Sequence, residues 1–175
     1  MLGGIEEGRL WNTKVRVKPG ATVEDMFFHI TPYLRKNPTN IICHVGTNNA
    51  TDDTSEQILQ KLLWLKNYIL LKVPNCKLYF SSPIVRKDDV DAARVVQEMN
   101  SKMFLLDTEL IDNSNIGKAE IGRKGLHMNG RGTKFLAVNF INILKVLKLH
   151  FKILVTKSGH QSDKILMSSY LNISR

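Results

Sequence analysis

The chain has 175 residues, 43% of them hydrophobic, which suits one globular domain with a single sizeable core. No apolar run reaches the roughly 18 residues of a membrane-spanning helix, and no charged leader with a cleavage site opens the chain, so we expect an intracellular protein without a membrane span. The 25 basic and 16 acidic residues give a net charge of +9, which is compatible with phosphate-bearing partners and equally with an ordinary solvated surface.

The first elements form a strand–helix–strand unit. A short strand is predicted at 14–18, followed by a Pro-Gly turn and a helix from Thr22 to Leu34 that Pro32 should disturb. Residues 40–45 are a continuous apolar run typical of a buried parallel strand. His44 is the polar interruption, and alone in such a run it is best interpreted as a hydrogen-bonded core residue.

The middle of the chain repeats this alternation. A capping box at Thr54 predicts a long amphipathic helix to Leu71. From the spacing of apolar and charged residues we then expect a strand at 77–80, a charged helix from Asp88 to Met103 and a short strand at 109–112. The expected fold class is therefore α/β, with a parallel sheet between two layers of helices.

The last predicted helix begins after Asn129 and runs to Leu149. We expect one domain over residues 1–149 and treat 150–175, where Ser, Lys and Asn are scattered, as an appendage. Cys43 and Cys76 lack metal-ligand spacing, so neither a disulfide framework nor a metal site is expected, and no cofactor is indicated.

Ligands of parallel sheets bind beyond the carboxyl ends of the strands, so three loops are candidates for chemistry. Gly20 offers an unhindered backbone N–H beside a helix N-terminus, and Asn48 offers an amide that can donate to an oxyanion. His127 directly precedes a helix N-cap and can act as a general base. Each also has a plain interpretation as a turn glycine, a helix-entry loop or an exposed histidine. Ser81 and Ser82 are expected to line the same cleft.

Together and in this order, three segments resemble the second, third and fifth conserved blocks of the SGNH (GDSL-type) hydrolases. They are Val17-Lys-Pro-Gly-Ala-Thr22, His44-Val-Gly-Thr-Asn-Asn49 and Gly125-Leu-His-Met-Asn-Gly-Arg-Gly132. More narrowly, residues 1–10 resemble a segment that directly follows Gly-Asp-Ser in esterase-like domains of animal non-LTR retrotransposons. The resemblance implies a three-layer, flavodoxin-like α/β/α fold, N-terminally truncated, that acts on acyl or acetyl esters.

In that family a serine attacks the ester carbonyl, a histidine takes its proton and an aspartate three residues earlier orients the imidazole. The resemblance makes Gly20 and Asn48 the oxyanion hole and His127 the base. Two parts depart from the pattern: no Gly-Asp-Ser precedes the first matched block, and Lys124 stands where the aspartate belongs. A lysine cannot accept the imidazole hydrogen bond and disfavours the imidazolium, so we expect an impaired enzyme.

The resemblance also implies a vacant position inside the sheet, because the family's first strand is an inner one. Residues 151–156 are the predicted candidate to enter it as a parallel strand, which would bring Ser158 near the place of the nucleophile. The alternative is a loosely docked tail.

Three functions therefore stay open. The first is an SGNH-type esterase, degenerate or completed by further residues. The second is a non-catalytic module that uses its basic surface to bind nucleic acid or copies of itself. The third is a translated mobile-element remnant without a role.

Overall fold

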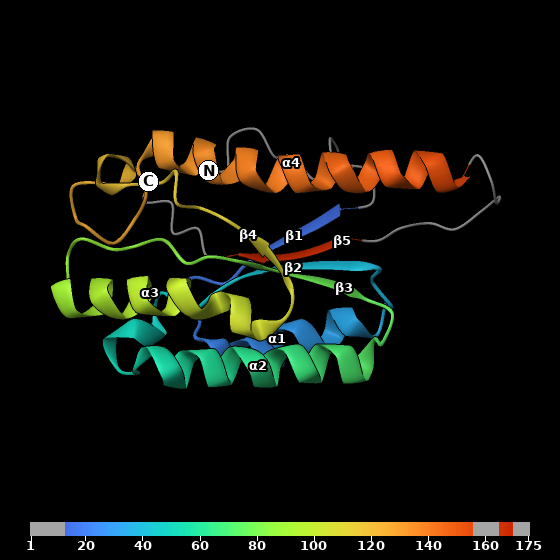
Figure 1. Cartoon of the computed structure of the whole chain (residues 1–175), viewed down its shortest axis with the longest axis horizontal. Coiled ribbons are helices and arrows are strands. Elements are labelled where there is room, and N and C mark those ends of the chain that lie inside the picture. The colour runs from blue at the N-terminus through green and yellow to red at the C-terminus, as the bar shows by residue number, and fades with distance from the viewer. Residues whose placement is uncertain (1–12, 156–164, 170–175) are drawn as a thin grey trace.

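The computed structural model describes residues 13–155 and 165–169, with side chains described from Lys14 to Leu144. Five parallel strands form one sheet in the order β1-β5-β2-β3-β4 (Figure 1). The strands are β1 (Thr13–Val17), β2 (Asn40–His44), β3 (Lys77–Ser81), β4 (Glu109–Ile111) and β5 (Ile165–Ser169). The predicted parallel α/β fold is confirmed, and the four strands expected before residue 113 lie within one or two residues of their predicted bounds.

Helices cover both faces of the sheet (Figure 1). On one face lie α1 (Val23–Leu34), α2 (Ser55–Lys72) and α3 (Val90–Lys102), and on the other lies α4 (Gly130–Val155). Short 3-10 helices at Asn49–Thr51, Met103–Leu106 and Lys118–Glu120 link these elements.

Side-chain caps fix where the helices begin. Thr22 and Thr54 form capping boxes with Asp25 and Gln57. The Oδ1 atom of Asn129 accepts hydrogen bonds from the backbone N–H groups of residues 131 and 132, both at 3.0 Å, which satisfies two of the donors that a helix leaves free at its start. The predicted starts of these three helices are therefore confirmed.

Pro32 does not end α1, which continues to Leu34. The missing N–H of Pro32 leaves only the carbonyl of Phe28 without its helical donor, and both residues are exposed, so water can replace that bond. The helix then loses little free energy by running two residues further.

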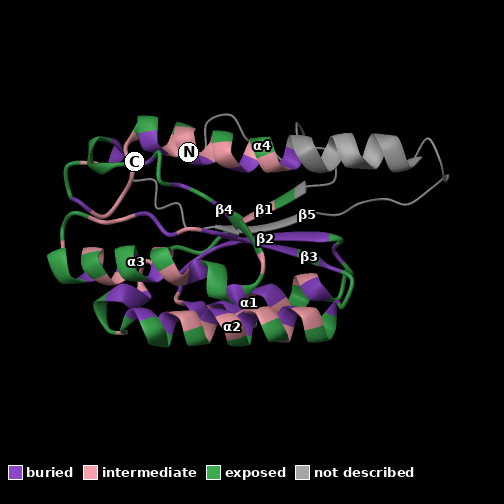
Figure 2. Ribbon diagram, viewed as in Figure 1, coloured by how far each residue is buried: buried purple, intermediate pink, exposed green. Residues whose placement is uncertain are grey.

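Two apolar clusters lie on the two sides of the sheet. The larger packs α1, α2 and α3 on the sheet and includes Ile41, Phe80, Leu62 and Met99, all at most 1% exposed. The smaller packs α4 on the other side through Leu136, Phe140 and Leu144 against Ile42 and Tyr79. Figure 2 shows the buried residues concentrated on β2, β3 and the inner sides of the helices.

The predicted strand at 151–156 is wrong, because residues 151–155 are the last turns of α4. Leu144, Leu147, Phe151 and Leu154 continue the three-to-four spacing of the helix, and no Gly or Pro interrupts it before Gly159. Local β-propensity is weak against such a pattern. Ser158 lies outside the described residues.

The inner position of the sheet is nevertheless filled by a later segment. β5 lies between β1 and β2, parallel to both, with Met167 in register with Val15 and Ile42. The strand in this position is formed by residues 165–169, which the sequence analysis did not predict, and not by 151–156.

Within the described residues, none of the helices is long and apolar enough to cross a lipid bilayer.

Candidate functional site

The loops that leave the carboxyl ends of β1 and β2 lie against each other. Gly20 adopts a positive φ of 77°, a conformation that favours glycine, and a Cβ built there would meet nothing within 4 Å. Its N–H makes no hydrogen bond within the described residues. The glycine therefore offers an open backbone donor at the edge of the sheet where parallel-sheet proteins bind ligands.

Asn48 joins this loop from the neighbouring strand. Its Nδ2 donates to the carbonyl of Ala21 at 3.3 Å, so the two segments predicted to form an oxyanion hole are brought together. Because an amide nitrogen carries two hydrogens, one stays available for a ligand while the other holds the side chain in place.

Asn49 is the residue that fastens the two loops, and the sequence did not single it out. It is 3% exposed, and its Oδ1 accepts the N–H of Val23 at 2.9 Å in the first turn of α1. Its Nδ2 donates to Glu24 at 2.9 Å and to Asp53 at 2.8 Å. The amide thus uses its acceptor and both donors to link α1 to the segment after β2. The signal in the sequence that could have pointed to Asn49 was its position directly after Asn48.

A lysine completes this linkage on the outside. Lys61 of α2 pairs with Glu24 and, at 2.6 Å, with Asp53. Burial pushes the pKa of Glu24 upward, but hydrogen bonds from Lys61 and Asn49 outweigh it and hold the pKa at about 2. The carboxylate is therefore charged at neutral pH and contributes to the rigidity of the loops.

His127 lies on a separate loop, which packs on the segment between β3 and α3. The carbonyl of Gly125 accepts the N–H of Lys87 at 2.8 Å, and the carbonyl of His127 accepts the N–H of Gly122 at 2.6 Å. The imidazole is partly exposed. Because the segment after β3 leaves the same carboxyl edge as those carrying Gly20 and Asn48, the three predicted residues share one edge of the sheet. No hydrogen bond among the described residues joins His127 to the other two.

The carboxylate beside this loop is Asp88, another residue that the sequence did not single out. A Cβ on Gly125 would come within 2.6 Å of the backbone nitrogen of Asp88. Hydrogen bonds from Arg86, both at 2.8 Å, lower the pKa of Asp88, and the charge of His127 lowers it further. Lys124, at the position of the family's aspartate, is exposed.

His44 is a core residue, as predicted, and it contacts Ser81 instead of lining a cleft. Its Nδ1 lies 3.0 Å from Ser81 Oγ, which accepts a hydrogen bond from Asn113 at 2.7 Å. Burial lowers the pKa of His44 to about 4, although the hydrogen bond with Ser81 opposes the shift. Asn139 of α4 donates to Asn113 at 2.9 Å, so this chain of polar side chains ties β2 and β3 to α4.

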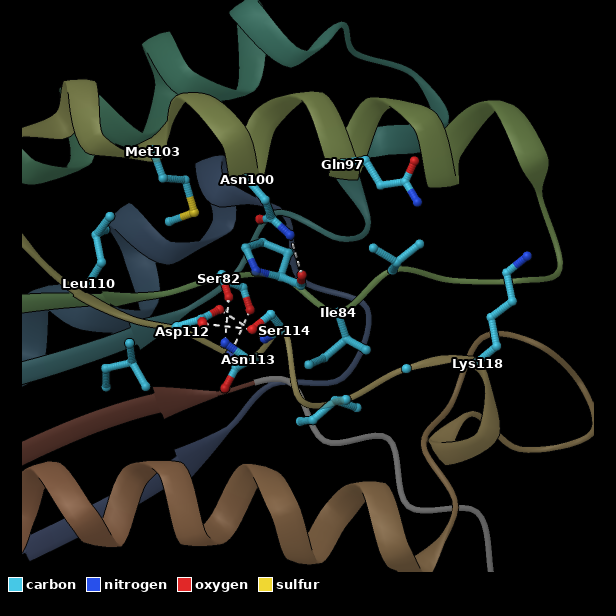
Figure 3. Close-up of a pocket in the computed structure, with 15 residues that line it drawn as sticks. Ser82, Ile84, Gln97, Asn100, Met103, Leu110, Asp112, Asn113, Ser114 and Lys118 are labelled. Carbon is cyan, nitrogen blue, oxygen red and sulfur yellow. Dashed lines mark hydrogen bonds between the residues drawn. The ribbon is translucent and has the colours of Figure 1, made fainter.

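Ser82 lines a pocket of about 550 Å³ at the carboxyl ends of β3 and β4 (Figure 3). Its apolar wall includes Ile84, Met103, Leu110, Ile111 and Ile116, and its polar wall includes Asn100, Asp112, Asn113 and Lys118. The Nδ2 of Asn100 donates to the carbonyl of Pro83 at 2.9 Å, and its buried Oδ1 has no partner among the described residues. Ser82 lines this pocket, but Gly20, Asn48 and His127 do not, and Ser81 is buried at 1% exposure. The structure therefore does not place the two serines in one cleft with the predicted site residues.

No group of three or more His, Cys, Asp or Glu side chains among the described residues is arranged to hold a metal ion. Cys43 and Cys76 are both buried free thiols, and burial raises the pKa of each to about 12.

The sequence matches no model of a known protein family, and no curated protein is significantly similar to it. Solved structures are similar in fold. They include a carbohydrate esterase of family 3 from Talaromyces cellulolyticus, with a TM-score of 0.62, 16% identity, and coverage of 72% of this chain and 69% of that one. A GDSL-like lipase from Parabacteroides merdae has a TM-score of 0.61, also at 16% identity and with the same coverage.

An acetyl esterase mutant crystallised with an acetate ion is similar to the same degree, with a TM-score of 0.61, 16% identity, and coverage of 73% of this chain and 70% of that one. At such identities the likeness concerns the fold. The chain therefore has the fold of SGNH/GDSL-type esterases, as the resemblance of its three segments implied.

Proposed function

We propose that this chain is an SGNH-type esterase domain for carboxylic esters, acetyl esters first among them, with catalysis impaired in the sequence as it stands. The observation that carries the proposal is the contact between Asn48 and Ala21, which brings one amide hydrogen and the open N–H of Gly20 to the same edge of the sheet. Donors fixed in this way stabilise the oxyanion that forms when an ester carbonyl is attacked.

In this proposal His127 is the general base. No cofactor is needed, because acyl transfer requires only a nucleophile, a base and an oxyanion hole. Impairment follows from a feature of the sequence: Lys124 stands where the family has the aspartate and cannot orient the imidazole.

The test is hydrolysis of p-nitrophenyl acetate by this chain and by a version in which a strand ending in Gly-Asp-Ser precedes Met1. Because β5 occupies the inner position of the sheet, the extended version is also made without residues 156–175. We expect a gain on extension that His127→Ala and Asn48→Ala abolish, and a further gain with Lys124→Asp. His29→Ala, on α1, is the matched control. No gain in any extended version contradicts the proposal.

A second candidate is a non-catalytic module that binds nucleic acid, and the distribution of charge favours it. Residues 14–112 carry 13 basic and 12 acidic residues, whereas 113–155 carry eight basic residues and one acidic residue. Two-thirds or more of the net +9 therefore falls on α4 and the loop before it. Binding to single-stranded RNA or DNA that weakens steeply with salt supports this function, and binding unaffected by salt contradicts it.

We also propose that the chain derives from an animal non-LTR retrotransposon and acts inside the cell. This proposal is supported by the similarity of residues 1–10, and of the three matched segments, to the sequences of such elements. The nucleotide sequence upstream of the codon for Met1 tests the derivation: an in-frame strand ending in Gly-Asp-Ser is expected.

A further inference from the structure

The basic residues of α4 follow one side of the helix. Arg131 and Lys134 are three residues apart, and Lys145, Lys148 and Lys152 follow at intervals of 11, three and four residues. At 3.6 residues per turn these intervals are close to one turn or to three turns, so the five positions form a single stripe. The stripe extends over 21 residues, about 31 Å at 1.5 Å per residue.

This stripe lies beside the face that packs on the sheet, not on it. Leu136, Phe140 and Leu144, at most 1% exposed, form the packed face, whereas Arg131 and Lys134 are exposed. Figure 1 shows α4 as the α-helix on its side of the sheet, and Figure 2 shows exposed residues on the part of α4 up to Leu144. A partner can therefore approach Arg131 and Lys134 without disturbing the core.

Further cations stand at the N-terminal end of the stripe. Lys118, Arg123 and Lys124 are exposed and have no ion-pair partner among the described side chains. Arg131 is 3.3 Å from Glu120 and lies over the ring of Phe135 at 5.3 Å, so it is partly neutralised but held in place. The backbone dipoles at the start of a helix add positive potential there.

We propose that the α4 stripe, defined as Arg131, Lys134, Lys145, Lys148 and Lys152, binds the phosphate backbone of a nucleic acid. This inference rests on the second proposed function and locates its surface. Lysines bind phosphates as point charges, so the contact carries no base specificity. Phosphate groups supply the repeated negative charge that an elongated row of cations complements.

An anionic membrane fits the same surface less well. Helices that bind a bilayer surface insert an apolar face between the lipids, and up to Leu144 the apolar face of α4 is already buried on the sheet. Val138, at 43% exposure, is the large hydrophobic residue exposed on the described side chains of α4. Up to Leu144, α4 therefore offers charge without the apolar insertion that stable membrane binding needs.

The experiment measures fluorescence anisotropy of a 20-nucleotide single-stranded RNA and of a duplex DNA of equal length, with the full chain, between about 50 and 200 mM salt. For single strands the slope of log K against log salt is about −0.7 for each phosphate contact, so five contacts predict about −3.5. The triple variant Lys145→Gln, Lys148→Gln, Lys152→Gln should flatten the slope by about 2 and weaken binding at least roughly tenfold.

The matched control removes three charges from the other helical layer by Arg35→Gln, Lys36→Gln and Lys72→Gln. All three residues are exposed; the first two directly follow α1 and the third ends α2. It should leave the slope unchanged. Equal weakening by both triple variants overturns the α4 stripe, because net charge alone would then explain binding. A wild-type chain that binds neither nucleic acid at low salt overturns the second function itself.

Vesicles containing phosphatidylserine serve as the remaining arm. Binding of the vesicles that the stripe variant abolishes, with no binding of RNA or DNA, assigns the surface to a membrane and overturns the proposal. Double substitution of Arg131→Gln and Lys134→Gln provides an independent variant at the well-capped start of α4, and circular dichroism confirms that each variant is folded.

Discussion

At the scale of single residues, Gly125 is the position in the His127 loop that least tolerates a side chain. It has a φ of +82°, and a Cβ there would lie 2.6 to 2.8 Å from three atoms of Asp88. We expect Gly125→Ala to lower the free energy of unfolding by about 2 kcal/mol or more, measured by urea denaturation. Gly130→Ala is the control, because a Cβ there meets nothing within 4 Å. Equal effects of both substitutions would contradict the tight packing of the loop on Asp88.

His44 should make stability depend on pH. Its folded pKa of about 4 is below the ordinary histidine pKa of 6.5, so the unfolded chain takes up the proton first. Stability is then complete above pH 6.5 and is lost as pH falls toward 4, by about 3 kcal/mol at 1.36 kcal/mol per pKa unit. Urea denaturation between pH 7 and 4 measures this loss. In His44→Gln this loss of stability between pH 6.5 and 4 should vanish. If the loss persists, another group causes it.

At the scale of elements, β5 is the strand on which the sheet depends most. It joins β1 to β2, and β1 pairs with no other strand among the described elements. Met167→Pro removes a ladder N–H in the middle of an inner strand and should cost about 3 kcal/mol or more. Met167→Val keeps the ladder and should stay near the wild type. Unchanged hydrogen exchange of β1 amides in the proline variant would show that β5 does not hold β1.

Most elements could be predicted from local signals, and the exceptions have physical causes. Thr22, Thr54 and Asn129 predict where their helices begin, because a helix cap is a hydrogen bond between residues close in sequence. β5 could not be found this way, because what places it is the pairing of distant backbone groups with a vacant position. Residues 151–155 show the converse: β-forming residues stay in a helix when no stop signal precedes them.

The candidate site divides in the same way. Gly20, Asn48 and His127 stand in recognisable segments, and the structure puts the loops of the first two in contact. Asn49 bonds to Val23 and Glu24, 26 and 25 residues away, and Asp88 lies against the backbone of Gly125; a pattern along the chain does not show such contacts. Ser81 likewise pairs with His44 across 37 residues.

At the scale of the whole molecule, charge is divided between the two helical layers. Eight basic residues and one acidic residue lie in 113–155, so their mutual repulsion opposes folding of the free chain. Raising salt from about 10 to 200 mM should therefore raise the melting temperature while it weakens nucleic-acid binding. Thermal melts measure the first effect. The triple variant of the α4 stripe should show a smaller increase than the Arg35, Lys36 and Lys72 variant, and the reverse order would contradict this division of charge.

The position of β5 also bears on how the molecule comes to be folded. Thr13 pairs with Ile165, so the contact that attaches β1 closes a loop of about 150 residues. During synthesis from the N-terminus, β5 is the last strand to be made. Until then β1, and the loop with Gly20 that follows it, has no strand to pair with among the described elements. For that interval the nascent chain presents two unpaired strand edges, which is where a chaperone, or a neighbouring nascent chain, would find it.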